Sequence, residues 1–471
     1  MPATASSPIS AADPADLSGT DLLTLYAARE LSPVEVMRAV IDRVEALEPH
    51  LQALYAFAPE TAIADATLSE ERWMRGEALP LDGIPATLKD NIATKGTPVP
   101  LGTAARPLDP APEDAPPAAR LREAGAILFA KTTMPDYGML SSGLSSFHPL
   151  TRNPWDRACN PGGSSAGAAA AAAAGYGPFH VGTDIGGSIR LPAGWCGIVG
   201  LKPSFGRVPI DPPYYGRVAG PMTRTVADAA LMMSVLSRPD DRDTMSLPPA
   251  NLPWHNLDLN PQGLRLGLLI EPGCGLPLDP QVRSVIEAAA EAYRQAGATV
   301  APVRPFVTRR MIDGLDRFWR ARAWADIGRL SAAEQEQVLS YIHAWAAGGR
   351  DLTGAEVHDG MSQMIALRQA ALAACRGFDF VLSPVSPGPA FAAELASPLH
   401  DPDRPFEHIA YTVPFNMSEQ PAISVNAGYT TGGLPVGLQI TGRRFNDCGV
   451  LRLARVWENL RPPQRPWPTV S

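Results

Sequence analysis

The sequence of 471 residues has no long hydrophobic run, no excess of basic residues and no paired cysteine motif. Its longest stretch of small apolar residues is the alanine run 168–174, whereas a membrane-spanning helix needs about 20 residues. The net charge of −8 and the lack of a basic stripe argue against a protein that binds nucleic acid. We therefore expect neither a membrane nor a nucleic acid as a partner.

The 5 cysteines are far apart in the chain, form no CxxC pair, and are odd in number, which fits no closed disulfide framework. They are typical of reduced thiols in a cytoplasmic protein. Residues 1–15 are rich in Pro, Ala and Ser and lack the basic and apolar regions of a signal peptide. We expect a disordered or frayed tail there and a cytoplasmic location.

Common motifs of metal and dinucleotide sites, such as HExxH and GxGxxG, are missing as well. A formal G-x-S-x-G nucleophile elbow occurs at 163–167, but the preceding residues 157–162 cannot form the strand that this elbow requires. None of the 8 histidines occurs with an Asp or Glu in a pattern that indicates a catalytic triad. The sequence thus gives weak support to a Ser-His-Asp triad, and we expect no metal and no cofactor.

Helices and strands alternate along the chain. The clearest unit is a strand at 264–270, a helix at 280–296 and a strand at 298–303, which is the βαβ pattern of a parallel sheet. The same alternation elsewhere predicts an α/β protein with helices on both faces of its sheet.

Glycine is dense between residues 160 and 206, and one segment there stands out. In 182–190, Gly186 and Gly187 directly precede Ser188 in a run otherwise rich in β-branched residues. Residues without side chains expose backbone N–H groups, which suit a developing oxyanion. The alternative is a glycine turn between strands with an incidental serine, and the segment alone leaves both interpretations open.

Lysine is rare in a chain that otherwise uses arginine, and occurs only at positions 89, 95, 131 and 202. Lysine can lose its proton inside a protein, whereas arginine cannot. Lys89 ends a strand-like apolar stretch, where burial would lower its pKa and leave a neutral amine able to act as a base. The alternative is a surface lysine. Ser164, in the loop before the alanine run, is either a helix cap or part of the same chemistry.

Together, these segments resemble the amidase signature family, from about residue 16 to about residue 460. The resemblance is densest between residues 82 and 228, where GIPATLKDN, PGGSSAG, GTDIGGSIRLPAGWCGIVGLKPSFGRVP and GPMTRTVADAA match the family pattern. The later PFNMSEQPAIS and GLPVGLQITG match as well. The resemblance implies one large α/β/α domain over 16–471, with a central mixed β-sheet covered by helices on both faces. It also implies a catalytic core at about 80–240 and a variable substrate-pocket region at about 305–377.

A catalytic mechanism follows from the same resemblance. It implies Ser188 as the nucleophile and Lys89 as the base, joined by Ser164 on a cis peptide bond. Four backbone N–H groups are implied as the oxyanion hole, those of Ile185, Gly186, Gly187 and Ser188. Further residues are implied to support the site, namely Gly163, Ser165, Thr183, Asp184 and Arg190. Lys131 and Lys202 are given structural roles.

The substrate is judged from how the chain departs from family members. Residues 214–221 read YYGRVAGP, whereas the glutaminase subunit of tRNA-dependent amidotransferases typically reads SSLDQ-GP. This departure and the acidic charge favour a free-standing enzyme, a monomer or homodimer similar to aryl acylamidases and urethane hydrolases. We expect it to cleave the C–N bonds of small aryl or hydrophobic amides, and in addition carbamates (urethanes) and esters.

Two alternatives come from other classes of protein. One is the glutaminase subunit itself, working in a larger complex. The other is a catalytically silent binding protein, which the intact Lys89, Ser164 and Ser188 argue against.

Aromatic residues in the variable region suit a pocket for an aryl group. The candidates for the pocket wall are Met134, Tyr137, Phe147, Trp319 and Phe415. For each of them, a core position at helical spacing is the alternative.

Overall fold

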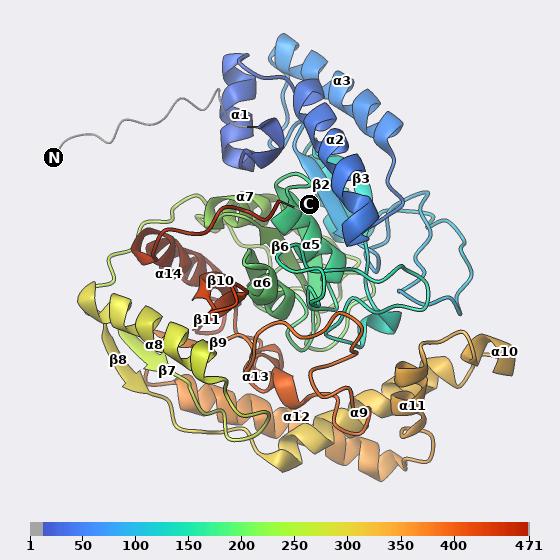
Figure 1. Ribbon diagram of the computed structural model, residues 1–471, viewed down its shortest axis with the longest axis vertical. Helices are drawn as coiled ribbons and strands as arrows, with labels where there is room; N and C mark the ends of the chain where they lie inside the picture. The colour runs from blue at the N-terminus through green and yellow to red at the C-terminus, as the bar shows by residue number, and fades with distance from the viewer. Residues whose placement is uncertain (1–12, 470–471) are drawn as a thin grey trace.

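One mixed sheet of 11 strands runs through the computed structural model, which describes residues 13–469 (Figure 1). In sheet order the strands are β1 (Leu54–Tyr55), β3 (Ile127–Thr132), β2 (Pro85–Lys89), β4 (Phe179–Asp184), β6 (Val218–Thr223), β5 (Val199–Lys202), β10 (Ala422–Tyr429), β11 (Pro435–Gly442), β9 (Phe380–Pro384), β7 (Arg265–Leu268) and β8 (Thr299–Pro302). Strands β3, β2 and β4 are parallel, as are β9, β7 and β8, and the strands between them pair antiparallel.

Helices cover both faces of this sheet, which confirms the predicted α/β class. The helices are α1 (Gly19–Ala28), α2 (Pro33–Leu51), α3 (Pro59–Arg75), α4 (Pro116–Glu123), α5 (Ala166–Ala174), α6 (Arg190–Cys196), α7 (Val226–Leu236), α8 (Pro280–Gln295), α9 (Arg309–Ile327), α10 (Ala332–Gln335), α11 (Ser340–Ala347), α12 (Gly354–Cys375), α13 (Val413–Met417) and α14 (Asp447–Leu460). Helices α4, α7, α8 and α14 share one hydrophobic core with the sheet, and α5 and α6 share another.

The ends of the expected elements fit the structure closely. The predicted βαβ unit is confirmed as β7, α8 and β8, with β7 and β8 parallel. Most of the expected tail, 1–15, lies outside the described residues, and the short 3-10 helix η2 (Pro14–Asp16) begins within the remainder. Within residues 13–469, no helix is both long enough and apolar enough to cross a membrane.

Helix α5 explains the alanine run. Every residue of α5 is buried, and a Cβ at Gly167 would lie 2.2 Å from the backbone oxygen of Ala53. Side chains that end at Cβ, or lack it, let the helix lie directly against the strand layer. The close fit fixes the loop before α5, which carries Ser164 and Ser165.

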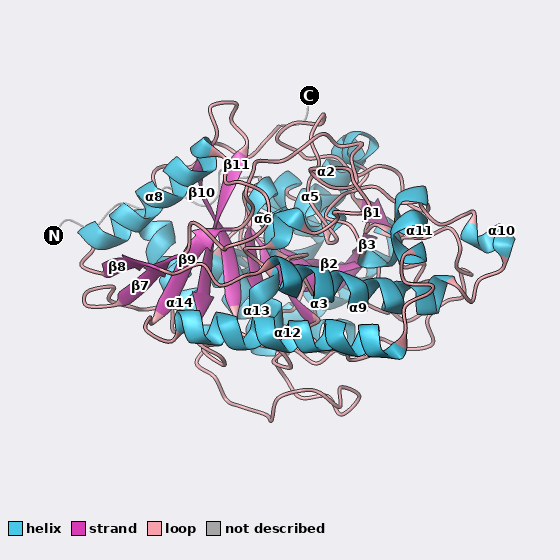
Figure 2. Ribbon diagram, turned by 90° about the horizontal axis from the view of Figure 1, so that it is seen from below, coloured by secondary structure: helices cyan, strands magenta, loops and turns pink. Residues whose placement is uncertain are grey.

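The variable region folds into α9 to α12, and α9 and α12 lie side by side below the sheet (Figure 2). Most of its bulky residues pack into one core, including Ile312, Leu315, Trp319, Ile342 and Trp345. The indole N–H of Trp345 donates to Asp316 at 2.8 Å, which fixes α11 on α9.

Candidate active site

Lys89, the last residue of β2, lies fully buried among hydroxyl side chains. Its Nζ is 2.8 Å from Oγ of Ser164, 3.0 Å from Oγ of Ser165 and 3.0 Å from Oγ1 of Thr183. Thr183 comes from β4, which pairs in parallel with β2, and both serines come from the loop before α5. The fold therefore brings Lys89 and Ser164 together, although they are 75 residues apart in the chain.

Burial lowers the pKa of Lys89 to about 7, because a charged amine loses its hydration there. The guanidinium of Arg217 lowers it further, while the carboxylates of Asp184 and Asp90 act in the opposite direction. A large fraction of this lysine is thus neutral near neutral pH. A neutral Nζ at this distance can accept the proton of the Ser164 hydroxyl.

The other two buried lysines make contacts of a different kind. Nζ of Lys131 donates to the backbone oxygens of Asp90 and Ile92, and Nζ of Lys202 donates to that of Pro203. Lys89 differs because its three neighbours are hydroxyl groups, which can both donate and accept.

Backbone packing holds the loop that carries Ser164. The peptide bond between Gly163 and Ser164 is cis. A Cβ at Gly163 would lie 2.5 Å from the backbone nitrogen of Ser142 and 2.6 Å from its oxygen, so only glycine fits. The N–H of Ser165 donates to the backbone oxygen of Ser188 at 3.2 Å, which joins this loop to the glycine-rich segment.

Ser188 follows a tight turn that ends β4. Its side chain is nearly buried, with 9% of the residue exposed. The N–H groups of Gly187 and Ile189 donate to the two carboxylate oxygens of Asp184, at 2.9 and 3.1 Å. Of the four amides expected to hold an oxyanion, that of Gly187 is thus already engaged. The amides of Ile185, Gly186 and Ser188 remain the predicted donors.

Asp184 and Arg190 form a fully buried ion pair beneath this turn. Arg190 donates to both carboxylate oxygens of Asp184, through Nε and Nη2, each at 3.0 Å. The positive charge of Arg190 opposes the effect of burial and holds the pKa of Asp184 well below its usual range. Arg190 donates further to Asn416 at 2.6 Å and to Gln439 at 2.7 Å.

Sequence reasoning missed three polar residues that complete this arrangement: Asn91, Asn416 and Gln439. Nδ2 of Asn91 donates to Oγ1 of Thr183 at 3.1 Å, and Nδ2 of Asn416 donates to Oδ1 of Asp184 at 2.8 Å. All three lie within the matched segments KDN, PFNM and GLQITG, so the motif matches carried a signal that could have found them.

A cavity of about 350 Å³ lies next to the Lys89 site, since its lining residue Asn91 donates to Thr183. A Cβ at Gly138 would lie 3.3 Å from Oγ of Ser164 and 3.2 Å from Cε of Met134. One at Gly186 would lie 3.3 Å from the Trp319 ring. The cavity is lined by Asn91, Ala93, Val99, Leu101, Arg106, Met134, Tyr137, Met139, Asp211, Pro212, Arg217, Trp319, Arg322, Ala323 and Asp326. Two residues of its wall therefore lie near the site: Met134 near Ser164 and Trp319 near the glycine turn.

Three of the five predicted wall residues line this cavity: Met134, Tyr137 and Trp319. Phe147 and Phe415 do not. Phe147 packs edge-on against His148, with ring centres 4.9 Å apart, and Phe415 is fully buried in a core with Leu269 and Val381. Neither position could be judged from the sequence, because each ring is turned away by the loop or short helix that carries it.

Charged residues are the part of the wall that the sequence did not reveal. Arg106, Arg217 and Arg322 line the cavity together with Asp211 and Asp326. Arg106, Asp211 and Asp326 are exposed to solvent, whereas Arg217 and Arg322 are half-buried. The wall thus combines apolar residues with two half-buried arginines.

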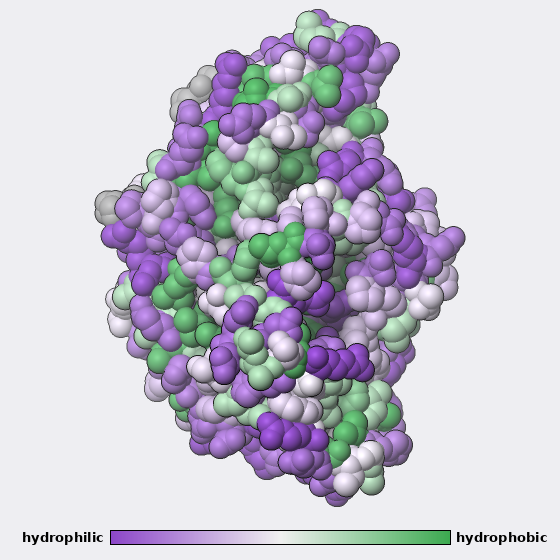
Figure 3. All heavy atoms as spheres, turned by 90° about the vertical axis from the view of Figure 1, so that its right-hand side faces the viewer, coloured by the Kyte–Doolittle hydropathy of each residue, from purple (hydrophilic) through white to green (hydrophobic). Residues whose placement is uncertain are grey.

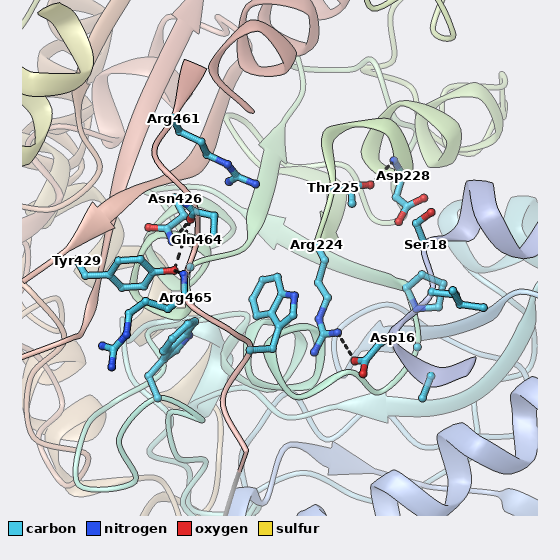
Figure 4. Close-up of a pocket in the computed structure, with 17 residues that line it drawn as sticks. Asp16, Ser18, Arg224, Thr225, Asp228, Asn426, Tyr429, Arg461, Gln464 and Arg465 are labelled. Atoms are coloured by element: carbon cyan, nitrogen blue, oxygen red, sulfur yellow. Dashed lines mark hydrogen bonds and ion pairs between the residues drawn. The ribbon is translucent and has the colours of Figure 1, made fainter. Parts of the chain in front are cut away.

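A second cavity, of about 230 Å³, shares no lining residue with the first (Figure 4). Arg461, Arg465 and Tyr429 approach it from the C-terminal part of the chain, and Asp16 and Arg224 form an ion pair at its edge.

Across the part of the surface in Figure 3, hydrophobic residues gather in separate groups between hydrophilic ones. Among the described residues, no group of three or more His, Cys, Asp or Glu side chains is placed to hold a metal ion.

Comparison with known proteins gives a consistent family. A family model described as Amidase matches residues 35–451. Curated relatives include the A subunit of glutamyl-tRNA(Gln) amidotransferase from Geobacter metallireducens, which is 35% identical over 94% of this chain and 97% of that one. The protein of the same name from Myxococcus xanthus is also 35% identical, over the same shares of the two chains.

Solved structures of similar shape include amidases. A bacterial aryl acylamidase of the amidase signature family superposes with a TM-score of 0.87 and 29% identity, covering 94% of this chain and 96% of that one. Peptide amidase from Stenotrophomonas maltophilia superposes with a TM-score of 0.81 and 27% identity, covering 96% and 98%.

The curated relatives contradict one expectation. We expected a free-standing hydrolase of small aryl or hydrophobic amides, with carbamates and esters as further substrates, and placed the amidotransferase component second. That preference is wrong, because the curated relatives over nearly the whole chain are A subunits of an amidotransferase. Arg217 and Arg322 give a physical reason, since a hydrophobic substrate would leave these two half-buried charges without partners.

Proposed function

The chain belongs to the amidase family and is an amide-hydrolysing enzyme, and from this premise we propose that it cleaves a small polar carboxamide and releases ammonia, with Ser188 as nucleophile. The observation that carries the proposal is the placement of Lys89 Nζ, 2.8 Å from Oγ of Ser164 and out of contact with solvent. A hydroxyl beside a buried neutral amine is an activated proton carrier.

In the first half of the reaction, Oγ of Ser188 attacks the amide carbon and forms a C–O bond. Its proton passes to Ser164, and the proton of Ser164 passes to Nζ of Lys89. The N–H groups of Ile185, Gly186 and Ser188 stabilise the oxyanion. The relay then runs backwards and protonates the amide nitrogen, so that the C–N bond breaks and ammonia leaves an acyl-enzyme.

In the second half, water attacks the acyl ester. The same relay accepts a proton from the water and returns it to Oγ of Ser188 as the C–O bond to the serine breaks. The products are a carboxylate and the free enzyme. Every residue returns to its starting protonation state at the end of the cycle.

Two observations support a polar carboxamide as the substrate. The relatives are named as subunits of an amidotransferase, which moves an amide nitrogen and so needs a carboxamide that gives it up. The cavity near Ser164 has two half-buried arginines in its wall, Arg217 and Arg322, which favour a polar group on the ligand. Glutamine is therefore the first amide to test.

The division of labour along the chain belongs to the same proposal. Residues 80–240 supply the relay and the glycine turn, and the region 305–377 supplies a wall of the cavity through Trp319 and Arg322. The cytoplasmic location, and the monomer or homodimer, stay predictions.

The test is ammonia release from glutamine, asparagine and a neutral amide such as propionamide, by wild type, Ser188→Ala and Ser362→Ala. Ser362 lies on α12, outside the cavity, and is the matched control. We expect release by wild type and by Ser362→Ala but not by Ser188→Ala, together with a hydroxamate when hydroxylamine replaces water. Full activity of Ser188→Ala would show that Ser188 is not the nucleophile. No release from any of these amides by folded wild type would overturn the proposed function.

A further inference from the structure

Two arginines reach the catalytic cavity from different elements. Arg217 directly precedes β6, and Arg322 lies on α9 one turn after Trp319. Residues 319, 322, 323 and 326 all line the cavity, so one face of α9 forms its wall. The two arginines therefore line one cavity together with Asn91, which donates to Thr183 beside Lys89.

The protein offsets the charge of Arg217 only at longer range, through the carboxylates of Asp243 and Asp211. Within residues 13–469 no carboxylate lies within ion-pair distance of Arg217 or Arg322, although most other buried or half-buried arginines of the fold have one. Arg217 donates to the backbone oxygen of Pro212. Arg322 stacks over the ring of Tyr214, 3.8 Å from its centre. With a hydrogen bond from Arg322 to the Tyr214 hydroxyl, these contacts orient the guanidinium groups and engage fewer than the five N–H donors that each one carries.

The pair is also electrostatically unfavourable as it stands. Burial lowers the pKa of Arg217 to about 10, and the charge of Arg322 contributes to the same shift. Two like charges in a half-buried space repel each other unless an anion lies between them. Asp211 and Asp326 line the same cavity but are exposed to solvent, and neither pairs with the arginines.

We propose that Arg217 and Arg322 bind a carboxylate of the substrate, so that the enzyme takes carboxamides that also carry a carboxylate. The class comprises the monoamides of short dicarboxylic acids and the side-chain amides of amino acids. A planar carboxylate can accept two parallel N–H donors from a guanidinium, which gives direction as well as attraction. This inference rests on the proposed function, because it names the residues that bind the end of the substrate opposite the amide that Ser188 attacks.

Two ligands of nearly the same shape separate the effect of the ligand's carboxylate charge from that of its size. Glutaramate carries one amide and one carboxylate, and glutaramide carries an amide at both ends. Binding of each is measured by titration calorimetry to the Ser188→Ala variant, which cannot turn them over. We expect glutaramate to bind at least about tenfold more tightly than glutaramide. Adding Arg217→Gln or Arg322→Gln removes this preference by weakening glutaramate alone.

The controls separate charge from folding. Arg217→Lys keeps the charge and restores part of the preference, while Arg310→Gln, an exposed position of α9 outside the cavity, changes neither affinity. Equal affinities for the two ligands, equal losses for both in the arginine variants, or no binding of glutaramate at millimolar concentration would each overturn the inference. If wild type hydrolyses glutaramide and shows no preference for glutaramate, the proposed function holds and the carboxylate site is rejected. If glutaramate binds tightly but wild type does not hydrolyse it, the carboxylate site holds and the proposed function is rejected.

Discussion

Nζ of Lys89 and Oγ of Ser164 lie 2.8 Å apart in a space closed to solvent. Water cannot replace either partner there, so the pKa of Lys89 is set by the surrounding protein. The four predictions that follow concern this pair and the groups that support it.

The activity should follow the deprotonation of Lys89. Its pKa is lowered from 10.5 to about 7, so the neutral form increases as the pH rises through 7 and is nearly complete two units higher. We expect kcat/KM to rise about tenfold per pH unit below 7 and to level off above it. Because the charge of Arg217 lowers this pKa, Arg217→Gln should shift the midpoint upward. A rate that rises as the pH falls below 7 would exclude Lys89 as the base.

Replacing Lys89 should remove activity but stabilise the fold. Lys89→Met removes the base, with an expected loss of about 10²–10⁴-fold in kcat. Between pH 7 and 10.5 the unfolded lysine binds a proton that the folded one has lost, so this group reduces stability, and less so as the pH rises. Methionine has no ionisable group and so avoids this penalty. We expect the free energy of unfolding of Lys89→Met, measured with urea at pH 7, to be roughly 1–3 kcal/mol higher than that of wild type. Lys95→Met, at an exposed position, serves as the control, and an active Lys89→Met enzyme would contradict the relay.

A single methyl group at position 163 should disturb the relay. Gly163→Ala places a Cβ 2.5 Å from backbone atoms of Ser142, so the loop that carries Ser164 has to move. Because small displacements of reacting groups reduce rates strongly, we expect kcat/KM to fall about 10²-fold. Gly354→Ala is the matched control, since a Cβ there meets nothing within 4 Å. Steady-state kinetics and thermal melting measure both variants, and wild-type kinetics for Gly163→Ala would show that the loop tolerates the shift.

Breaking the buried ion pair should destabilise the whole fold. Asp184→Asn leaves the Arg190 guanidinium without its counter-charge, and the expected cost is about 3–5 kcal/mol. In wild type the pKa of Asp184 lies below its ordinary value of 3.8, so its contribution is present above that value and is lost as the pH falls below it. The variant should therefore lose less stability than wild type between pH 5 and pH 3. Parallel acid titrations followed by circular dichroism measure this difference, and identical titrations would refute it.

The sequence predicted well those features that short segments encode. The βαβ unit at 264–303, the α/β class and the family motifs follow from local periodicity and from runs such as PGGSSAG. Lys89 could be singled out because lysine is rare and because it ends an apolar stretch.

The character of the cavity could not be predicted, because it depends on residues that are far apart. Arg217 precedes a strand and Arg322 lies on a helix about a hundred positions later, and only the three-dimensional structure brings both to one cavity. The same holds for the aromatic residues of 305–377. Helical spacing shows that they share a face, but not whether that face meets the cavity or the core: Trp319 lines the cavity, whereas Trp345 lies in the core.

The placement of α9 has a consequence for how this protein could be altered. The relay stands on β2, β4 and the loop before α5, whereas Trp319, Arg322, Ala323 and Asp326 project from one separate helix. A library confined to these four positions would vary ligand choice without touching a single atom of the proton path. The protein is therefore a suitable starting point for directed evolution, because residues of one helix can be varied while the catalytic residues stay unchanged.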